Sequence, residues 1–315
     1  MLLFWIIFNL FVLAMLALDL GLSKSGVRRL GAPRLDPGSQ GVSFRRALAW
    51  SAIWIALAAA FAVIVFFWHG RTLALQFVTG YVIELSLSID NLFVFLLIFR
   101  YFKVAGEHQH KVLLGGIVGA LVMRGLFIWL GVSLIGRFQW ITYAFGALLI
   151  YSGCRLLWQG EKKIDPDKNF ILRGVRRILP VTDDYVGGQF FTRRNGLYAT
   201  PLLVALLVIE TTDVLLAIDS VPAVLSITVN PFIVYTSNVF AILGLRSMYF
   251  ALAGMIDLFH YLHYGLSAVL IFIGVKMLAA HYVTIPTEWA LGVVVVVLGA
   301  SILMSLLHPQ TKPSV

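Results

Sequence analysis

The chain is organised around Val82-Ile83-Glu84-Leu85-Ser86-Leu87-Ser88-Ile89-Asp90-Asn91 and a near-repeat of it, Thr211-Thr212-Asp213-Val214-Leu215-Leu216-Ala217-Ile218-Asp219-Ser220. Each stretch has an acid, a mostly apolar run, then Ile, Asp and a small polar residue. Aligning them places Glu84 on Asp213, Asp90 on Asp219 and Asn91 on Ser220. The second stretch has a further acid, Glu210, one helical turn before Asp213.

Both stretches lie inside apolar segments that are long enough to cross a bilayer. A charged side chain at that depth costs roughly 2.5–3.5 kcal/mol. Five such acids together cost more than ~12 kcal/mol, which is comparable to the net stability of a typical protein, about 5–15 kcal/mol. We therefore expect a cation to offset them, and we interpret the stretches as parts of a metal-ion site.

The composition is that of a multi-pass membrane protein. Of 315 residues, 60% are hydrophobic and 12% are charged, against about 25% charged in soluble domains. Continuous apolar runs favour helices over a membrane barrel, which would show alternation. The single cysteine, Cys154, excludes an intrachain disulfide and a cysteine-based zinc cluster. The first apolar run lacks the features of a cleaved signal peptide, so we expect it to remain as a helix.

The expected fold is all-α, a single integral membrane domain of about nine transmembrane helices. The apolar segments are approximately 2–20, 47–67, 73–99, 112–131, 138–158, 201–227, 231–256, 263–281 and 287–307. Residues 1–67 form two N-terminal helices, and residues 287–307 form the C-terminal helix. Between them lie two three-helix units, 73–158 and 201–281, joined by a basic loop, 159–200.

The basic residues indicate the orientation. Lys and Arg are concentrated in loops 24–46, 100–111 and 159–200, whereas only Arg71 and Arg137 lie on the opposite side. The positive-inside rule places the N-terminus outside and the C-terminus in the cytoplasm. This distribution explains the net charge of +9 without a nucleic-acid partner.

The two three-helix units are predicted to be inverted repeats. Arg124 in the second helix of one unit corresponds to Arg246 in the other, and Ala147 to Arg155 aligns with Ala268 to Lys276. With the orientation above, the two copies run in opposite directions across the membrane. Secondary transporters commonly have this construction, with a site near the midplane where the repeats meet. Chance similarity between apolar helices is the alternative, but the matched charges argue against it.

Helical geometry divides the acids into two groups. Glu84 and Asn91 share a face of their helix, as do Asp213 and Ser220, whereas Asp90 and Asp219 point about 120° away from these faces. All could converge on one site only if a helix is broken or a neighbour completes the site. Pro222 predicts such a break beside Asp219.

The candidate ligands are all oxygen donors, which suit hard cations such as Mn²⁺, Mg²⁺ or Ca²⁺ and do not discriminate among them. The predicted metal residues are Glu84, Asp90, Asn91, Glu210, Asp213, Asp219 and Ser220. Arg124 and Arg246 are predicted to balance charge when no ion is bound. In the alternative interpretation, the acids and arginines form only structural salt bridges.

Other polar groups receive structural interpretations. In the 159–200 loop, the spacing from Ile171 to Leu179 predicts a helix lying on the inner membrane surface, ended by Pro180. Asp183 and Asp184 are interpreted as turn residues rather than cation ligands. Asp19 and Asp257 are expected at helix ends. The pair His260 and His263 has metal-ligand spacing but is interpreted as interfacial.

The acidic motifs resemble those of the TerC family of membrane proteins, and within it the Alx-type manganese exporters. The resemblance rests on residues 84–91, on residues 210–223 and on the loop from Pro180 to Gly196, and it covers nearly the whole chain. It implies a bundle of about nine helices in the bacterial cytoplasmic membrane and export of Mn²⁺. It further implies that Glu84, Asp90, Glu210, Asp213 and Asp219 serve transport.

The leading hypothesis is therefore a secondary transporter that exports Mn²⁺, with protons as the counter-ion. No nucleotide-binding motif is present, so an ion gradient is the expected energy source. The alternative is a non-transporting membrane scaffold or partner subunit in metal or tellurium stress. An enzyme is not expected, because no zinc-protease motif or nucleophile elbow is present; an aspartyl protease built on a carboxylate pair is the weakest alternative.

Overall fold

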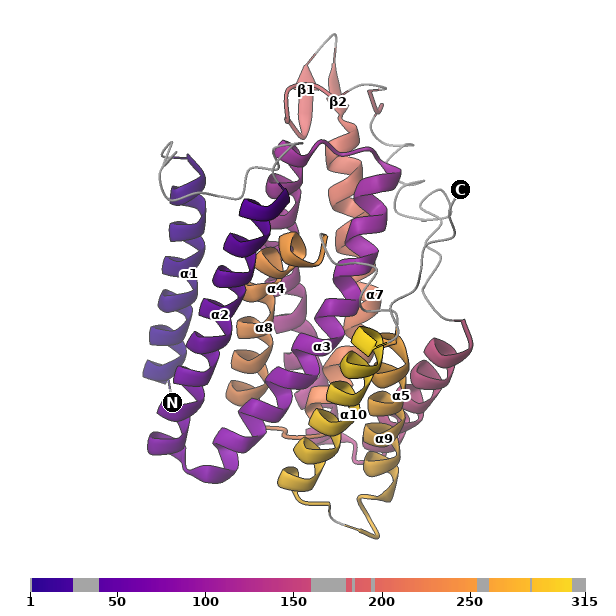
Figure 1. Cartoon of the computed structure of the whole chain (residues 1–315). Coiled ribbons are helices and arrows are strands. Elements are labelled where there is room, and N and C mark those ends of the chain that lie inside the picture. The colour runs from indigo at the N-terminus through magenta and orange to yellow at the C-terminus, as the bar shows by residue number, and fades with distance from the viewer. Residues whose placement is uncertain are drawn as a thin grey trace.

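Long helices and one short hairpin make up the part of the chain that the structure describes (Figure 1). The computed structural model describes residues 2–24, 40–159, 180–182, 185–193, 196–253, 261–283 and 285–307. The helices in these ranges are α1 (Leu2–Lys24), α2 (Gln40–His69), α3 (Arg71–Tyr101), α4 (Gly106–Arg137), α5 (Trp140–Gln159), α7 (Pro201–Leu225), α8 (Pro231–Ala253), α9 (Leu262–Ala279) and α10 (Thr287–Leu307). Strands β1 (Phe191–Arg193) and β2 (Leu197–Ala199) pair antiparallel.

The predicted all-α membrane bundle is confirmed. Within the described ranges, seven helices are long and apolar enough to cross a membrane, namely α2, α3, α4, α5, α7, α9 and α10. The apolar stretches in α1 and α8 are shorter, Leu3–Ala17 and Pro231–Leu245. The expectation of nine crossings therefore exceeds what length and composition establish.

Local chemistry explains where several helices begin. Gly70 alone separates α2 from α3, and its φ of 85° lies in the left-handed region that favours glycine. At the start of α8, Asn230 Oδ1 accepts hydrogen bonds from the N–H groups of Phe232 (3.1 Å) and Ile233 (3.4 Å). Proline occupies the first position of both α7 and α8, where its missing N–H costs nothing.

Four helices, α3, α4, α7 and α8, form the centre of the bundle. Helix α3 packs against α7 and α8, and α4 packs against the same two helices. Helix α2 covers α3 and α8, while α5, α9 and α10 form a group on the other side (Figure 1). Helix α1 lies at the edge, where Phe8 contacts Phe61 of α2 and Phe240 of α8.

The hairpin closes one end of the central helices. Val181, Tyr185 and Phe190 pack on the apolar cluster formed by the adjacent ends of α3, α4, α7 and α8. The Tyr185 hydroxyl donates a 2.5 Å hydrogen bond to the Phe102 carbonyl. Burial raises the pKa of Tyr185, so the hydroxyl keeps the proton that it donates. Lys111 Nζ donates to the Gly188 carbonyl at 3.2 Å.

The predicted break in the second acidic helix is wrong. Helix α7 runs without interruption from Pro201 to Leu225, with Pro222 inside it. Pro222 cannot donate to the Ile218 carbonyl, but this lost hydrogen bond does not end the helix. The turn is completed beyond the proline, where Ser226 N–H donates to the Pro222 carbonyl at 3.0 Å. The α3 helix is continuous as well.

Glycines allow α5 and α9 to approach closely. A Cβ on Gly274 would lie 2.6 Å from the carbonyl oxygen of Gly146. A Cβ on Gly153 would lie 2.9 Å from the carbonyl oxygen of Ser267, and the Ser267 hydroxyl donates a hydrogen bond to the Gly153 carbonyl. Because the obstructing atoms belong to the backbone, no rotamer change can make room for a side chain.

We predict that Gly274→Ala destabilises the bundle by about 1–3 kcal/mol, the usual cost of overpacking. The matched control is Gly299→Ala in α10, where a Cβ meets no atom within 4 Å. Thermal unfolding of the purified variants in detergent measures the difference. Equal unfolding temperatures for the two variants would contradict the close contact of α5 with α9.

Candidate functional site: a charged layer in the bundle

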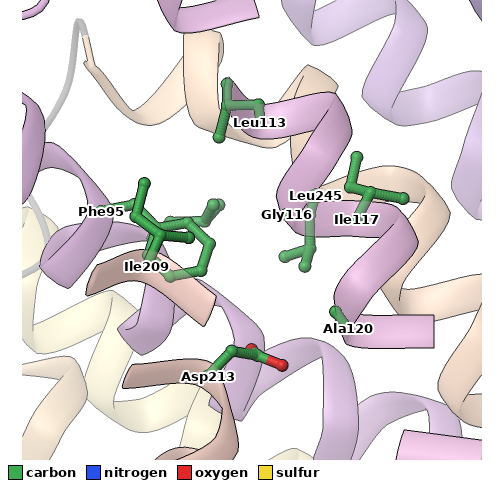
Figure 2. A pocket seen from close by; sticks show the side chains of 9 residues that line it. Phe95, Leu113, Gly116, Ile117, Ala120, Ile209, Asp213 and Leu245 are labelled. Carbon is green, nitrogen blue, oxygen red and sulfur yellow. The ribbon is translucent and has the colours of Figure 1, made fainter. Parts of the chain in front are cut away.

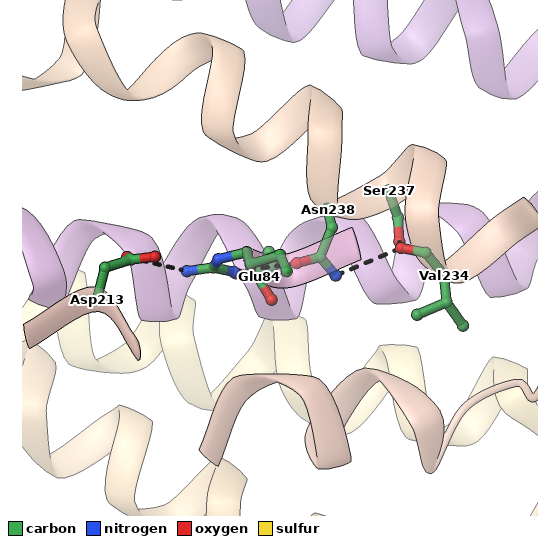
Figure 3. Close-up of polar contacts among 6 residues, drawn as sticks. Glu84, Asp213, Val234, Ser237 and Asn238 are labelled. Atoms are coloured by element: carbon green, nitrogen blue, oxygen red, sulfur yellow. Dashed lines mark hydrogen bonds and ion pairs between the residues drawn. The ribbon is translucent and has the colours of Figure 1, made fainter. Parts of the chain in front are cut away.

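A polar layer crosses the four central helices at about half their length. Each helix contributes one residue: Glu84 from α3, Arg124 from α4, Asp213 from α7 and Asn238 from α8 (Figure 3). The side chains are buried, with exposures of 0% for Glu84 and 1% each for Arg124 and Asn238. One apolar cluster lies on the hairpin side of this layer, and a second, built mainly with α9 and α10, lies on the other side.

Arg124 connects the members of the layer. Its Nη1 forms an ion pair with Glu84 Oε1 and donates a 3.0 Å hydrogen bond to Asn238 Oδ1. Its Nη2 lies 3.5 Å from Asp213 Oδ1. The Asn238 amide donates in turn to the Val234 carbonyl at 3.3 Å. The guanidinium therefore lies between carboxylates from two different helices (Figure 3).

The layer carries more negative charge than Arg124 can balance. Among the described side chains of the layer, two carboxylates face one guanidinium, which leaves one negative charge when both acids are ionised. Asp213 Oδ2 is buried and has no hydrogen-bond partner. An uncompensated buried charge is costly, so this arrangement favours the binding of one more cation, either a proton or a metal ion.

Unpaired oxygen donors line the two acidic helices next to the layer. The hydroxyls of Ser88 on α3 and Ser220 on α7 are buried without a hydrogen-bond partner, and so is the amide nitrogen of Asn91. Gly80 lies beside Val224, and Leu92 and Asp213 line the same cavity. Helices α3 and α7 run antiparallel, and these two contacts fix their alignment. Glu84 is therefore level with Ser220, and Asn91 is level with Asp213.

Asp213 also borders a small apolar cavity on the hairpin side of the layer (Figure 2). Its volume is about 10 Å³, enough for a single water molecule. Asp213 is the one charged residue among those that line it, which are Leu92, Phe95, Leu113, Gly116, Ile117, Ala120, Ile209, Asp213 and Leu245. In this conformation an apolar plug separates Asp213 from the hairpin end of the bundle.

Glu210 lies in a different place, on the side of the bundle between α4 and α7. It lines an open cavity of about 410 Å³ together with Val122, which is 65% exposed. The carboxylate lies directly over Gly119 of α4, where even a Cβ would overlap it. Glu210 is only partly buried, so it faces the surroundings of the bundle rather than the charged layer.

The second aspartate of the second motif, Asp219, also turns away from the layer. Asp219 Oδ1 accepts a 2.6 Å hydrogen bond from the hydroxyl of Ser152 on α5. Asp90 is partly buried on α3. The contact of Asp219 with α5 agrees with the 120° offset expected for a continuous helix.

The structure thus brings together Glu84 and Asp213 of the predicted metal residues, with Asn91 and Ser220 on the adjoining faces. Glu210, Asp90 and Asp219 are not part of that layer. Among the described residues, no three His, Cys, Asp or Glu side chains form a group that could hold a metal ion. Arg124 lies between Glu84 and Asp213, and its charge-balancing role stays a prediction.

Several predictions fall outside the described residues. These are the surface helix at 171–179, the turn residues Asp183 and Asp184, Asp257, His260, and the side chains of Asp19 and Arg246. The proposed equivalence of Arg246 with Arg124 therefore stays a prediction.

The sequence analysis did not identify Asn238, Ser88, Ser152 or Gly119. Ser88 follows Glu84 by one helical turn, so its place on the same face could have been found from spacing. Nothing in the sequence distinguishes Asn238 or Ser152 from other polar residues of apolar helices. Their roles depend on which helices pack together.

The fold and this layer define an integral membrane protein of the helical-bundle class with charged residues buried at mid-depth. The family model described as "Integral membrane protein TerC family" matches residues 69–313. The chain therefore belongs to the TerC family, and the resemblance found in its acidic motifs is confirmed.

Curated relatives extend over nearly the whole chain. An uncharacterized membrane protein of Myxococcus xanthus, STKORF319, is 46% identical over 98% of this chain and 94% of its own length. The Escherichia coli (strain K12) protein Alx, described provisionally as a membrane-bound redox modulator, is 43% identical over 93% of this chain and 90% of its own. A Rickettsia bellii membrane protein is 36% identical over 96% and 97%. No solved structure matches the chain.

The position of Glu210 can be tested by cross-linking. In a Cys154→Ser background, we predict that the double variant Gly119→Cys with Glu210→Cys forms a disulfide readily, because the two side chains meet across α4 and α7. The control pair is Gly125→Cys with Glu210→Cys, because Gly125 lies about 9 Å further along α4 than Gly119. A mobility shift in non-reducing gels reports the bond. Equal cross-linking of both pairs would contradict the described contact.

Proposed function

We propose that this chain is a secondary transporter, rather than an enzyme, and that it exports Mn²⁺ from the bacterial cytoplasm through the charged layer. One observation carries the proposal. Two buried carboxylates from the two acidic motifs face a single guanidinium, which leaves a negative charge for a cation to balance. A purely structural ion pair has no need of the second carboxylate.

The donor set supports a hard divalent cation. The carboxylates of Glu84 and Asp213 and the hydroxyls of Ser88 and Ser220 are oxygen donors within the same part of the bundle. Oxygen donors suit Mn²⁺, Mg²⁺ and Ca²⁺ rather than thiolate-seeking metals. Mn²⁺ is the member of this group that the family resemblance indicates. In this proposal Asp90, Glu210 and Asp219 would contact Mn²⁺ elsewhere along its route through the bundle.

Two contacts support the proposal that α3–α5 and α7–α9 are inverted repeats. The sequence alignment pairs Gly146 with Ser267 and Gly153 with Gly274. Gly146 contacts Gly274. Their counterparts in the other unit, Ser267 and Gly153, also contact each other, so both of the contacts that a two-fold axis requires are present. Such mutual exchange is what a two-fold axis in the membrane plane produces.

The acidic helices follow the same rule. Glu84 lies level with Ser220, and their repeat counterparts, Asp213 and Asn91, also lie level with each other. The charged layer is then at the junction of the repeats, the usual place of a transport site. In this scheme α1 and α8 also cross the membrane, giving nine crossings with the N-terminus outside and the C-terminus in the cytoplasm.

Protons are the economical counter-ion. Two carboxylates in a low dielectric cannot remain jointly ionised with one guanidinium unless a cation joins them. A proton can be the cation that neutralises the extra carboxylate, and a metal ion that binds the carboxylates displaces that proton. Exchange of protons for Mn²⁺ would therefore keep the layer neutral or nearly so in both directions of movement.

The ion pair between Arg124 and Glu84 favours a second candidate function, a membrane scaffold in which these charges join helices. Truncating one partner of a buried pair is then strongly destabilising. The relative's description as a redox modulator suggests a third role. The single cysteine, Cys154, cannot supply dithiol chemistry within one chain.

Transport of Mn²⁺ into proteoliposomes tests the proposal. Asp213→Asn and Asp90→Asn are expected to lower the rate at least about tenfold, since even indirect partners of metal ligands alter affinity by that factor. The control is Glu288→Gln, an exposed acid in the first turn of α10. Vesicles with an acidic lumen should take up external Mn²⁺ faster, because protons that leave the lumen drive Mn²⁺ inwards.

Two results would contradict parts of this proposal. If the Asp213→Asn protein transports Mn²⁺ normally, the layer is not the ion site. If the acid variants instead lose folded protein in the membrane while the residual protein keeps its transport rate, the acids of the layer are structural and the ion takes another route. Indifference of the rate to a pH gradient would remove proton exchange alone.

A further inference from the structure

We infer that Arg124 is a tethered competitor of the transported cation, and that Asn238 is the neutral acceptor to which it withdraws. This inference rests on the proposed function and assigns the switching role to two residues of the same site. The guanidinium occupies the space between Glu84 and Asp213. A divalent ion that joins these carboxylates must first displace it.

The contacts of Arg124 are suited to such displacement. One nitrogen, Nη1, is shared between the carboxylate of Glu84 and the amide oxygen of Asn238. The Asp213 contact, at 3.5 Å, is looser than a good charge-assisted hydrogen bond. Nε and Nη2 have no hydrogen-bond partner. The guanidinium is therefore held in place by charge more than by a full set of hydrogen bonds.

Electrostatics requires the guanidinium to move when a metal ion binds. A divalent ion within contact distance of both carboxylates would lie a few ångströms from the positive charge of Arg124. In a low dielectric, repulsion at that range is as strong as the attraction that holds the arginine to one acid. The arginine cannot leave the bundle either, because an unpaired guanidinium at this depth is costly.

Asn238 provides the place to which Arg124 can turn. Its amide group donates to the Val234 carbonyl at 3.3 Å, which directs Oδ1 towards Arg124 as an acceptor. Asn238 is uncharged, so it holds the guanidinium without competing for the metal ion. It lies on α8 and contacts Nη1, as Glu84 does, whereas Asp213 faces Nη2; Figure 3 shows Asp213 and Asn238 on opposite sides of Glu84.

In both states a positive charge faces the two carboxylates: the guanidinium of Arg124 without metal, and the metal ion when it is bound. Without metal, Arg124 reduces the negative charge of the layer and allows the empty site to change its access. With metal, the arginine rests on Asn238 and keeps the affinity low enough for release. A site without Arg124 would bind the ion too tightly to deliver it.

Mn²⁺ binding to the purified full chain in lipid nanodiscs tests the inference, with the loss of the free-ion electron paramagnetic resonance signal as the readout. Arg124→Gln is expected to lower the Kd for Mn²⁺ at least about tenfold, because one competing charge is removed. Asn238→Leu is expected to raise the Kd several-fold, because the displaced guanidinium has no acceptor. The matched control is Ser237→Ala, which removes a hydroxyl that donates to the same Val234 carbonyl but does not contact Arg124.

Opposite changes at two touching residues cannot arise from a general loss of folding. If Arg124→Gln does not fold, the Asn238→Leu measurement decides alone. Unchanged or weaker binding by a folded Arg124→Gln protein, or unchanged binding by Asn238→Leu, would overturn the inference. Absence of Mn²⁺ binding and transport in the unaltered chain would instead remove the proposed function itself.

Discussion

The guanidinium of Arg124, shared by carboxylates from two helices, is the interaction on which the rest of the structure depends. It lies at mid-depth in a bundle whose neighbouring layers are apolar, so its charge and those of Glu84 and Asp213 must be satisfied within the protein. The three charges do not cancel. In the proposed function, a bound cation offsets this imbalance.

The surrounding packing keeps water away from that layer on the hairpin side. Leu92, Phe95 and Ile209 belong to an apolar cluster above Asp213, and the hairpin covers the same end of the bundle. On the far side, close contacts between α5 and α9 hold the two three-helix units together. The layer also joins the two units, so movement of one unit against the other would change the contacts of Arg124 with Asp213 and Asn238.

Spacing alone predicted the membrane helices and the shared faces of Glu84 with Asn91 and of Asp213 with Ser220. These properties depend on the local period of a helix and on hydrophobicity, both of which are written in one segment. The break at Pro222 was wrongly predicted, because α7 accommodates the proline and ends only at Leu225. The roles of Asn238, Ser152 and Gly119 depend on helix packing, which no local pattern contains.

The most direct test is an anomalous-scattering map of crystals grown with Mn²⁺. The account predicts one peak between α3 and α7, within ligand distance of the carboxylates of Glu84 and Asp213, with Arg124 turned onto Asn238. A map without a peak in the charged layer, or with Arg124 still joining both carboxylates at saturating Mn²⁺, would contradict it.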